Sequence, residues 1–555
     1  MFARIKRTGG HEYVQIVENH RQGGKVRQTV IATLGRRDLL QAGDSLESLM
    51  ASLARIAQHA IVVAEGMPEE RLGVNAWRIG GPLVFQRLWE ETGCQAVIQG
   101  LLQKRNFEFP LERILFATVL QRIFDPGSDR ACTQWIQGYR IPGLEGAQLH
   151  HWYRAMGWLG EALPPSAQRG ALPFAPRSTK DLIEEALFRN EQNLFTEIDV
   201  AFFDTTTLFF EGEGGGSIGA RGHNKDGHPE LNQMVVGVVL DGRGNPLCCE
   251  MWPGNTSDVT TLIPIVDRLR RKFHVRSFCI VADRGMISKE TIDDLEARKL
   301  EYILGARMRS TSEVNDQVLS RPGRYRVVHP APETTEDPSA LQVKEVWVED
   351  HRYVVCLNPD QARRDEAVRG AILESLEKSL AGGDKSLVGN RGYRRYLRSA
   401  GQSFAIDEEK VAEEKRYDGK WVLRTNTTLP AEDVALRYKQ LWTVEALFRT
   451  MKSFLDTRPI FHKVDETICG HVFCSFLAMK LMTELRRRME AKHGDVEWGR
   501  ALEDLEALTE TELVQDGKRF LLRSALRGDA GRLFQATGVR IPPTIRLVRQ
   551  GGGEE

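Results

Sequence analysis

The sequence has no excess of charge of either sign, because 76 lysines and arginines balance 76 aspartates and glutamates among its 555 residues. No global positive potential therefore indicates a nucleic-acid partner, and any site for a polyanion must come from local clustering. The eight cysteines include no CxxC pair and stand mostly among apolar neighbours. This scatter predicts reduced, buried thiols in a cytosolic protein rather than a disulfide framework.

Targeting and membrane signals are also missing. The start, MFARIKRTGG, lacks the apolar run of a signal peptide, and we find no stretch of about 18 apolar residues that would predict a membrane span. No internal repeat or low-complexity block stands out. With 41% hydrophobic residues the chain is expected to be globular, soluble and intracellular, with about three to four domains and no membrane partner.

The first 190 residues change from a β-type to a helical pattern. The runs EYVQIVENH and KVRQTVIATLG, joined across RQGGK, predict a hairpin within residues 1–43. Residues 1–37 hold eight basic and two acidic residues, a surplus of six, which fits either a phosphate-contacting arm or a solvated small sheet. From 44 to 190 the pattern is helical, and DPGSDRA, from Asp125, breaks one helix.

Three β-rich blocks follow within residues 191–304, namely TEIDVAFFDTTTLFF, NQMVVGVVLDGRGNPLCCEMWPGN and HVRSFCIVADRG. Helical patterns lie between and after them, so strand pairs followed by βα units predict a mixed α/β sheet. A second β-rich region spans 305–430 and is interrupted by a charged helix near 362–380. Helical text resumes at 431–490, and 491–555 is expected to be helical with a flexible end, GGGEE.

Two aspartates stand in unusual places in this pattern. Asp204 lies inside an apolar β run, where an ionised group is costly unless it is paired or bound to a cation. Asp283 directly follows the apolar strand FCIVA, at the kind of strand end where α/β proteins build sites. Each has a plainer reading, because an aspartate that closes a strand is often a turn former or a helix cap.

The stretch YKQLWTVEALFRTMK, residues 438–452, is expected to form one amphipathic helix. Tyr438, Glu445 and Lys452 are seven residues apart, which is nearly two turns, so all three are expected along one line of the helix. Taken alone, Glu445 is a typical surface residue. A strand aspartate, a strand-end aspartate and a helix glutamate in this order would together form an oxygen-only cation site.

The spacing resembles that of the DDE transposases of bacterial insertion sequences, in the insertion-sequence-four superfamily. Their signature helix reads Tyr, two residues, Arg, three residues, Glu, six residues, Lys; Tyr438, Glu445 and Lys452 match it, while Leu441 replaces the arginine. Further similar segments are FFDTTT, GHNKDGHPELNQ, WPGNTSD, VADRGMIS and RPIFHKVDETICGHVFCSFLA. The resemblance runs from about 198 to 480 and continues more loosely through residues 1–190.

The resemblance implies the fold and the domains. The fold would be α/β, with a ribonuclease-H-like mixed sheet interrupted by a mainly β insertion domain and preceded by a helical DNA-binding region. The expected domains are a basic hairpin arm (1–43), a helical DNA-binding region (44–190), the catalytic core in two parts (191–304 and 431–490), the insertion (305–430) and a C-terminal helical region (491–555).

The resemblance also implies the chemistry, which is cleavage at transposon ends followed by attack of the freed 3′-hydroxyl on target DNA. Two Mg²⁺ ions, for which Mn²⁺ is expected to substitute, would lie about 3.5–4 Å apart. Asp204 would bridge both ions, and Asp283 and Glu445 would each hold one. A same-fold nuclease or resolvase without strand transfer, and a non-catalytic DNA-binding protein, are the alternatives; the three retained acids argue against the second.

DNA contacts are implied for five further residues: Tyr438, Arg449, Lys452, Trp421 and Arg284. Trp421 would stack on a flipped base, for which Trp347 competes and a tryptophan packed in a sheet is the plainer reading. The partners would be double-stranded DNA, as terminal inverted repeats and target, and a second copy of the chain in the synaptic complex. The implied location is the bacterial cytosol, at the nucleoid.

Several histidines and cysteines invite a metal reading. His462, Cys469, His471 and Cys474 fit no common zinc spacing, and their segment has the pattern of a buried helix, so we do not expect zinc there. His223 and His228 lie in a polar segment of the matched region and are expected near the site, without an assigned role.

Overall fold

The computed structural model describes residues 1–22, 25–42, 45–57, 73–103, 105–168, 175–191, 198–275, 277–332, 334, 337–381, 394–400, 403–494, 496–515 and 518–548. The expected hairpin turn at Gly23 and Gly24 and the terminal GGGEE lie outside these ranges. The chain divides into two compact units, each described separately: Met1–Leu83 with Gln137–Arg140 and Val496–Glu555, and Val84–Ile136 with Ile141–Asp495.

The first unit contains both ends of the chain. Strands β1 (Phe2–Thr8), β2 (His11–Gln22) and β3 (Lys25–Arg36) form an antiparallel sheet, followed by α1 (Arg37–Ala42) and α2 (Ser45–Ile56). A second sheet has the order β18 (Ile545–Val548), β17 (Lys518–Arg523), β16 (Thr509–Gln515) and β4 (Gly73–Arg78), with helices α16 (Trp498–Glu506) and α17 (Ala530–Thr537). The expectation of a helical region at 491–555 is therefore wrong in part, because three strands lie there.

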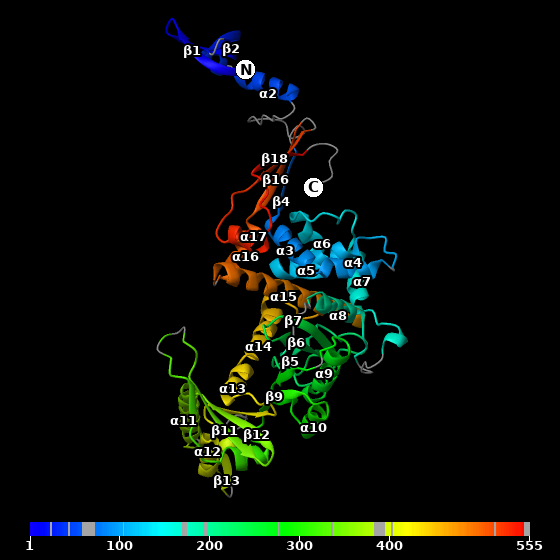
Figure 1. Ribbon diagram of the computed structural model, residues 1–555, viewed down its shortest axis with the longest axis vertical. Helices are drawn as coiled ribbons and strands as arrows, with labels where there is room; N and C mark the ends of the chain where they lie inside the picture. Colours follow the sequence, from blue (N-terminus) through cyan, green and yellow to red (C-terminus); the bar gives the residue numbers. More distant parts are fainter. Residues whose placement is uncertain are drawn as a thin grey trace. The chain divides into compact units, whose positions relative to one another are not determined.

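A nine-stranded mixed sheet dominates the second unit (Figure 1). Its order is β10 (Arg326–His329), β11 (Leu341–Val348), β12 (His351–Leu357), β15 (Lys420–Thr425), β9 (Glu301–Ala306), β8 (Cys279–Ala282), β5 (Val200–Phe209), β6 (Gln233–Asp241) and β7 (Pro246–Pro253). Strands β5, β8 and β9 are parallel, whereas β6 is antiparallel to both β5 and β7. This arrangement confirms the expected mixed sheet of a ribonuclease-H-like core.

The expected β insertion extends this sheet instead of forming a separate one. Strand β15 pairs antiparallel with β9, and β12, β11 and β10 continue outward. The insertion also holds α11 (Pro359–Ala381), the hairpin β13 (Leu397–Ala400) with β14 (Ser403–Ile406), and α12 (Glu408–Lys415). The core and the insertion therefore share one hydrogen-bonded sheet.

Helices cover both faces of the central strands. On one face, Ala201 and Phe203 of β5 pack into an apolar cluster with α9 (Leu262–Arg271) and α10 (Lys289–Ala297). Because side chains alternate along a strand, Phe202 and Asp204 point to the opposite face. Helices α13 (Ala431–Lys439) and α14 (Trp442–Arg449) contact this part of the sheet, with α13 on β8 and β9 and α14 on β5 and β6.

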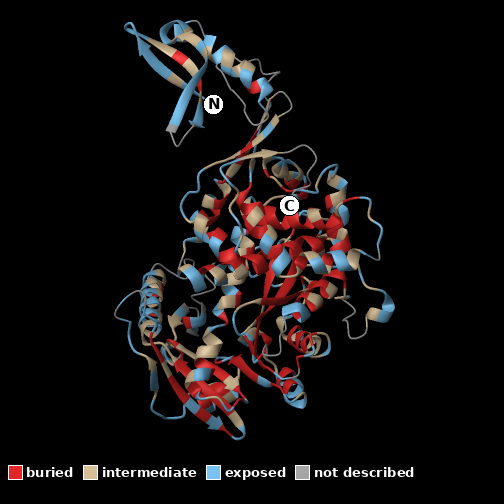
Figure 2. Ribbon diagram, turned by 45° about the horizontal axis from the view of Figure 1, so that its top comes forward, coloured by how far each residue is buried: buried red, intermediate tan, exposed pale blue. Residues whose placement is uncertain are grey.

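The long helix α15 (Asp465–His493) packs directly on α5 (Leu111–Phe124) and α7 (Leu149–Gly160). The remaining helices are α3 (Gly80–Glu91), α4 (Cys94–Leu102), α6 (Asp129–Trp135) and α8 (Thr179–Glu191), and α4, α6 and α8 contact one another or α5 and α7. Helix α15 is long and apolar enough to cross a membrane, contrary to our expectation that no such stretch exists, but 83% of its apolar window is buried inside the protein. Figure 2 shows buried residues concentrated in these helices and the central strands.

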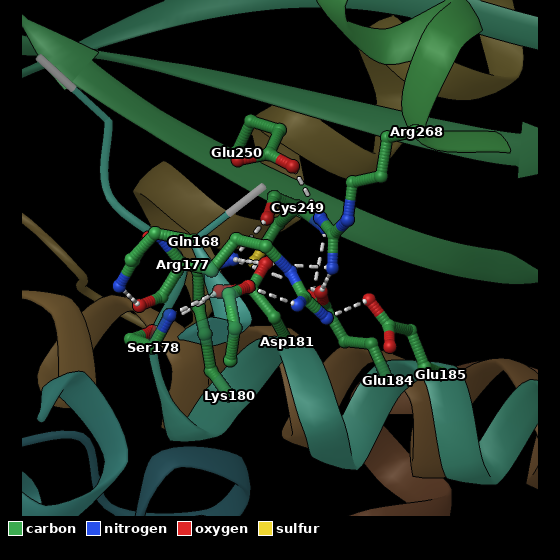
Figure 3. A network of polar contacts seen from close by, with 11 residues as sticks. Gln168, Arg177, Ser178, Lys180, Asp181, Glu184, Glu185, Cys249, Glu250 and Arg268 are labelled. Atoms are coloured by element: carbon green, nitrogen blue, oxygen red, sulfur yellow. Dashed lines mark hydrogen bonds and ion pairs between the residues drawn. The ribbon is translucent and has the colours of Figure 1, made fainter. Parts of the chain in front are cut away.

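A buried ionic network joins α8 to the sheet and to α9 (Figure 3). The Arg268 guanidinium of α9 contacts Asp181 at 2.7 Å and Glu184 at 2.5 Å, and also binds Glu250 of β7. The Lys180 ammonium donates to the Cys249 carbonyl at 2.8 Å. Each charge of such a network is stabilised by its partners, because a single charge is costly to bury alone. Loss of one member would therefore leave the others unpaired.

Candidate active site

Asp204 and Asp283 lie side by side in the parallel pair of β5 and β8. The last paired residues are Phe203 and Ala282; Asp204 is the next residue of β5, and Asp283 directly follows the end of β8 in an extended conformation. Ala282 packs into the apolar cluster with Phe203, and alternation therefore turns both carboxylates to the face covered by α13 and α14. The structure thus brings together two of the three acids that the sequence singled out.

Burial strongly perturbs the first of these acids. It raises the pKa of Asp204 to about 7, and the nearby Asp283 and Asp258 carboxylates add to the effect, whereas the Lys225 ammonium and the Thr205 N–H, which donates at 2.7 Å, oppose it. Adjacent carboxylates repel unless a cation lies between them. The oxygen donors and the raised pKa therefore fit a hard divalent cation such as Mg²⁺.

The Tyr438 side chain contacts Asp283, one of these two acids, and is partly buried rather than exposed. Its hydroxyl donates to Asp283 Oδ1 at 2.9 Å, and burial together with Asp283 raises the pKa of the tyrosine. The contact requires glycine at position 305 of β9, because a Cβ there would lie 2.5 Å from the Tyr438 hydroxyl oxygen. Tyr438 was expected to meet a DNA phosphate; the structure gives it the position of a residue that orients Asp283.

The expectation of one continuous helix over 438–452 is wrong. Helix α13 ends at Lys439, α14 begins at Trp442, and residues Thr450–Phe454 form a π-helical turn, η9. Between the helices, the Leu441 N–H bonds to Tyr438 and the Val444 N–H to Leu441, both three residues back. Because this tighter turn and the wider π turn interrupt the α repeat, Tyr438, Glu445 and Lys452 do not share one line.

Glu445 lies on the exposed face of α14. Among the described residues no three His, Cys, Asp or Glu side chains are grouped closely enough to hold an ion, so the structure does not join Glu445 to the aspartate pair. The buried Val444 and Phe448 fix α14, which packs on β5, the strand of Asp204. Leu441, which stands at the family's arginine position, is 4% exposed and contributes to the apolar interior instead of contacting phosphate.

The expected DNA contacts differ in exposure. Arg284 and Arg449 are exposed, whereas Lys452 is mostly buried and pairs with Asp226. Trp421 is half-buried in β15, and its indole N–H is buried without a hydrogen-bond partner among the described residues. Trp347 in β11 is 52% exposed.

Sequence reasoning missed two charged residues beside the aspartates. The Lys225 ammonium donates to the Thr205 carbonyl at 2.8 Å and to the Thr205 hydroxyl at 2.9 Å, and lies 3.2 Å from Asp258 Oδ2. The Thr205 hydroxyl in turn donates to Asp258 at 2.7 Å. The two missed residues are Lys225, in the segment GHNKDGHPELNQ, and Asp258, in WPGNTSD. Their place in segments similar to the family was the only sign in the sequence that they lie near the site. Trp442, beside Glu445 on α14, was also missed and is 63% exposed.

Of the four histidines considered above, His462 and His471 contact polar groups of the interior, whereas His223 and His228 are exposed. His471 contacts Arg122 at 2.9 Å and the Thr457 carbonyl at 3.1 Å, and His462 lies 3.7 Å from Asp129. His223 is exposed, and the exposed His228 lies 3.4 Å from Glu230. Cys474 is buried, Cys469 is nearly so, and burial raises the pKa of the Cys469 thiol to about 12.

Comparison with known proteins identifies two families in the sequence. The transposase DDE domain matches residues 196–462, and the N-terminal domain of IS1634 family transposases matches residues 3–65. Together the two matches cover more than half of the 555 residues. Comparison with curated protein sequences finds no significant match.

Among solved structures, the chain is similar to a piggyBac transposase in a synaptic complex with hairpin DNA, solved by cryo-electron microscopy. The two are 11% identical with a TM-score of 0.37, and the match covers 77% of this chain and 79% of that one. At so low a TM-score, the assignment depends on the two family matches. The chain belongs to the DDE transposases of insertion sequences, enzymes that act on DNA, and its function is DNA transposition.

Proposed function

We propose that this transposase cleaves DNA at the ends of its insertion sequence and joins the freed 3′-hydroxyl to target DNA in a cut-and-paste reaction that requires Mg²⁺. The observation that carries the proposal is the Asp204–Asp283 pair, two carboxylates on adjacent strand positions that face the same helical layer. The raised pKa of Asp204 supports the proposal, because the ionised carboxylate is unfavourable there and a bound cation would stabilise that ionised form.

Asp204 and Asp283 would hold the metal, with Glu445 as the third carboxylate. Bound divalent ions would acidify a water nucleophile and stabilise the leaving oxygen. The chain's own contribution is to fix the acids: Tyr438 holds Asp283 through its hydroxyl, and α14 packs on the strand that carries Asp204. Support for Glu445 comes from the family signature and from its place on that helix.

DNA would be held by cations and aromatic side chains around this face. Arg284 directly follows Asp283 and Arg449 lies one turn after Glu445, and both are exposed. For stacking on a flipped base, Trp421 and Trp347 remain the two candidates, and the exposure of Trp347 favours it over the half-buried Trp421. The basic sheet β1–β3 would contact DNA elsewhere on the element end. We further propose that two copies assemble on the paired ends, in the bacterial cytosol.

A product analysis separates transposition from simple cleavage. Wild-type protein incubated with Mg²⁺ and a labelled duplex carrying the element's terminal repeat is expected to release a 3′-hydroxyl end and join it to a target plasmid. EDTA is expected to abolish both steps, and Mn²⁺ to restore them, because both need ions held by carboxylates. Cleavage without any joined product would instead indicate a nuclease, and an unchanged substrate would indicate a DNA-binding protein.

A further inference from the structure

The Asp226 carboxylate lies between two cations beside the candidate active site. Its oxygens are 2.9 Å and 3.1 Å from the Lys452 ammonium, and one of them also binds the Arg458 guanidinium. The three side chains are 11%, 15% and 22% exposed for Lys452, Asp226 and Arg458. Two largely buried cations thus share one anion, which leaves a local surplus of positive charge.

This cation pair is fixed to the strand that carries Asp204. The Ile460 N–H donates to the Phe209 carbonyl at the end of β5, and the Arg458 guanidinium lies over the Phe209 ring at 5.4 Å. Lys452 belongs to η9, which directly follows α14. An anionic oxygen held by Lys and Arg is the usual protein environment of a phosphate as well as of a carboxylate.

The segment that carries Asp226 is held by ion pairs, by a hydrogen bond from the Lys225 N–H to the Thr207 hydroxyl and by a ring contact between His228 and Phe209 at 5.3 Å. Residues 221–230 include no buried residue, and Gly227 has φ +84° with open space around its Cβ position. Lys225 binds Thr205 and Asp258 on the acidic side, while Asp226 binds the two cations. Consecutive residues thus place the Lys225 ammonium beside the Asp258 carboxylate and the Asp226 carboxylate between two cations. Because the segment has no buried side chain, a phosphate can replace the Asp226 carboxylate without disturbing the apolar core.

We propose that Lys452 and Arg458 form a phosphate-binding site for DNA and that the Asp226 carboxylate occupies this site until DNA displaces it. The proposal deepens the proposed function, because it assigns Arg458 to DNA binding and makes the 221–230 segment a built-in competitor of the DNA backbone. A ligand that must displace an internal group binds more weakly by the fraction of time for which the site is open.

Asp226→Asn is expected to increase DNA affinity about tenfold, as if the site were open about a tenth of the time in the wild type. The measurement is fluorescence anisotropy of a labelled duplex carrying the terminal repeat, with full-length protein in EDTA. Glu230→Gln is the matched control, because it makes the same charge change at a side chain that is 64% exposed in the same segment. Its effect is expected to stay below about twofold.

The gain must depend on the cation pair. In an Arg458→Gln background, Asp226→Asn is expected to change affinity by less than about twofold, because additivity fails for groups that share one site. A full gain in that background, a loss of affinity in Asp226→Asn, or equal effects of Asp226→Asn and Glu230→Gln would overturn the proposal.

Hydrogen exchange of the wild-type protein tests the displacement of Asp226 without any substitution. DNA is expected to speed hydrogen exchange of the 221–230 amides, because the segment loses its ionic contacts; slower or unchanged exchange would contradict displacement. Both measurements are made without metal. A protein that binds DNA in this way and never cleaves it would disprove the proposed function while leaving this inference intact.

Discussion

Asp204→Asn is expected to lower DNA cleavage about 10³-fold and, in the same protein, to raise stability in the absence of metal. Metal-ion catalysis is worth several kcal/mol, and about 4 kcal/mol corresponds to this factor. The amide keeps the size of the carboxylate but is a poor metal ligand. Cleavage of a labelled end in Mg²⁺ measures the first effect, and the urea midpoint in EDTA at pH 8 measures the second.

The stability effect has a defined pH window. The Asp204 pKa is about 7 in the folded protein, against about 4 in an unfolded chain. Between these values the folded state binds more protons, so this group's contribution to stability falls as pH rises from about 4 to about 7 and stays lost above. Asn removes that loss, which is on the order of 2–4 kcal/mol.

Asp199→Asn is the control for this variant. Asp199 is an exposed residue directly before β5 and is expected to affect neither cleavage nor the midpoint. A lower midpoint for Asp204→Asn at pH 8 in EDTA would show that the carboxylate stabilises the fold, and would contradict the destabilising effect that its burial predicts.

Arg268→Met is expected to destabilise the second unit by about 3–5 kcal/mol, because it leaves buried carboxylates without their cation. The Arg268 side chain is 9% exposed and joins Asp181, Glu184 and Glu250 from two different elements (Figure 3). Urea or thermal unfolding followed by circular dichroism would measure the change.

Arg271→Met provides a matched comparison on the same helix. The Arg271 side chain is 63% exposed and lies 3.7 Å from Asp267. An exposed pair of this kind contributes less than about 1 kcal/mol. Equal losses for the two variants would mean that the buried network contributes no more than a surface ion pair.

Local patterns predicted the mixed sheet and the aspartate pair well. Asp204 interrupts an apolar run and Asp283 ends one, and both signals are contained in a few neighbouring residues. The pairing of β4 with β16 was not predictable, because it joins Gly73–Arg78 to residues more than 400 positions later. Lys225 and Asp258 were missed because polar loop residues carry no periodicity, and only the folded chain shows what they contact.

The signature helix shows how tertiary packing overrides a regular pattern. The seven-residue spacing predicted that Tyr438, Glu445 and Lys452 point one way. The break before Trp442 and the π turn after Arg449 instead turn Tyr438 to Asp283 and Lys452 to Asp226. Leu441, at the position of the family's arginine, is buried at that break and serves the packing of the helix.

We propose that α14 supplies, through Glu445, the third carboxylate that would hold the metal. The alternative to Glu445 as third carboxylate is Asp258, which accepts a hydrogen bond from the Thr205 hydroxyl and contributes to the raised pKa of Asp204. The most direct measurement is end cleavage in Mg²⁺ by Glu445→Gln and by Asp258→Asn, with duplex binding in EDTA as the control for both. We expect Glu445→Gln to bind DNA normally and to show no cleavage above background; full cleavage by Glu445→Gln together with loss in Asp258→Asn would contradict the claim.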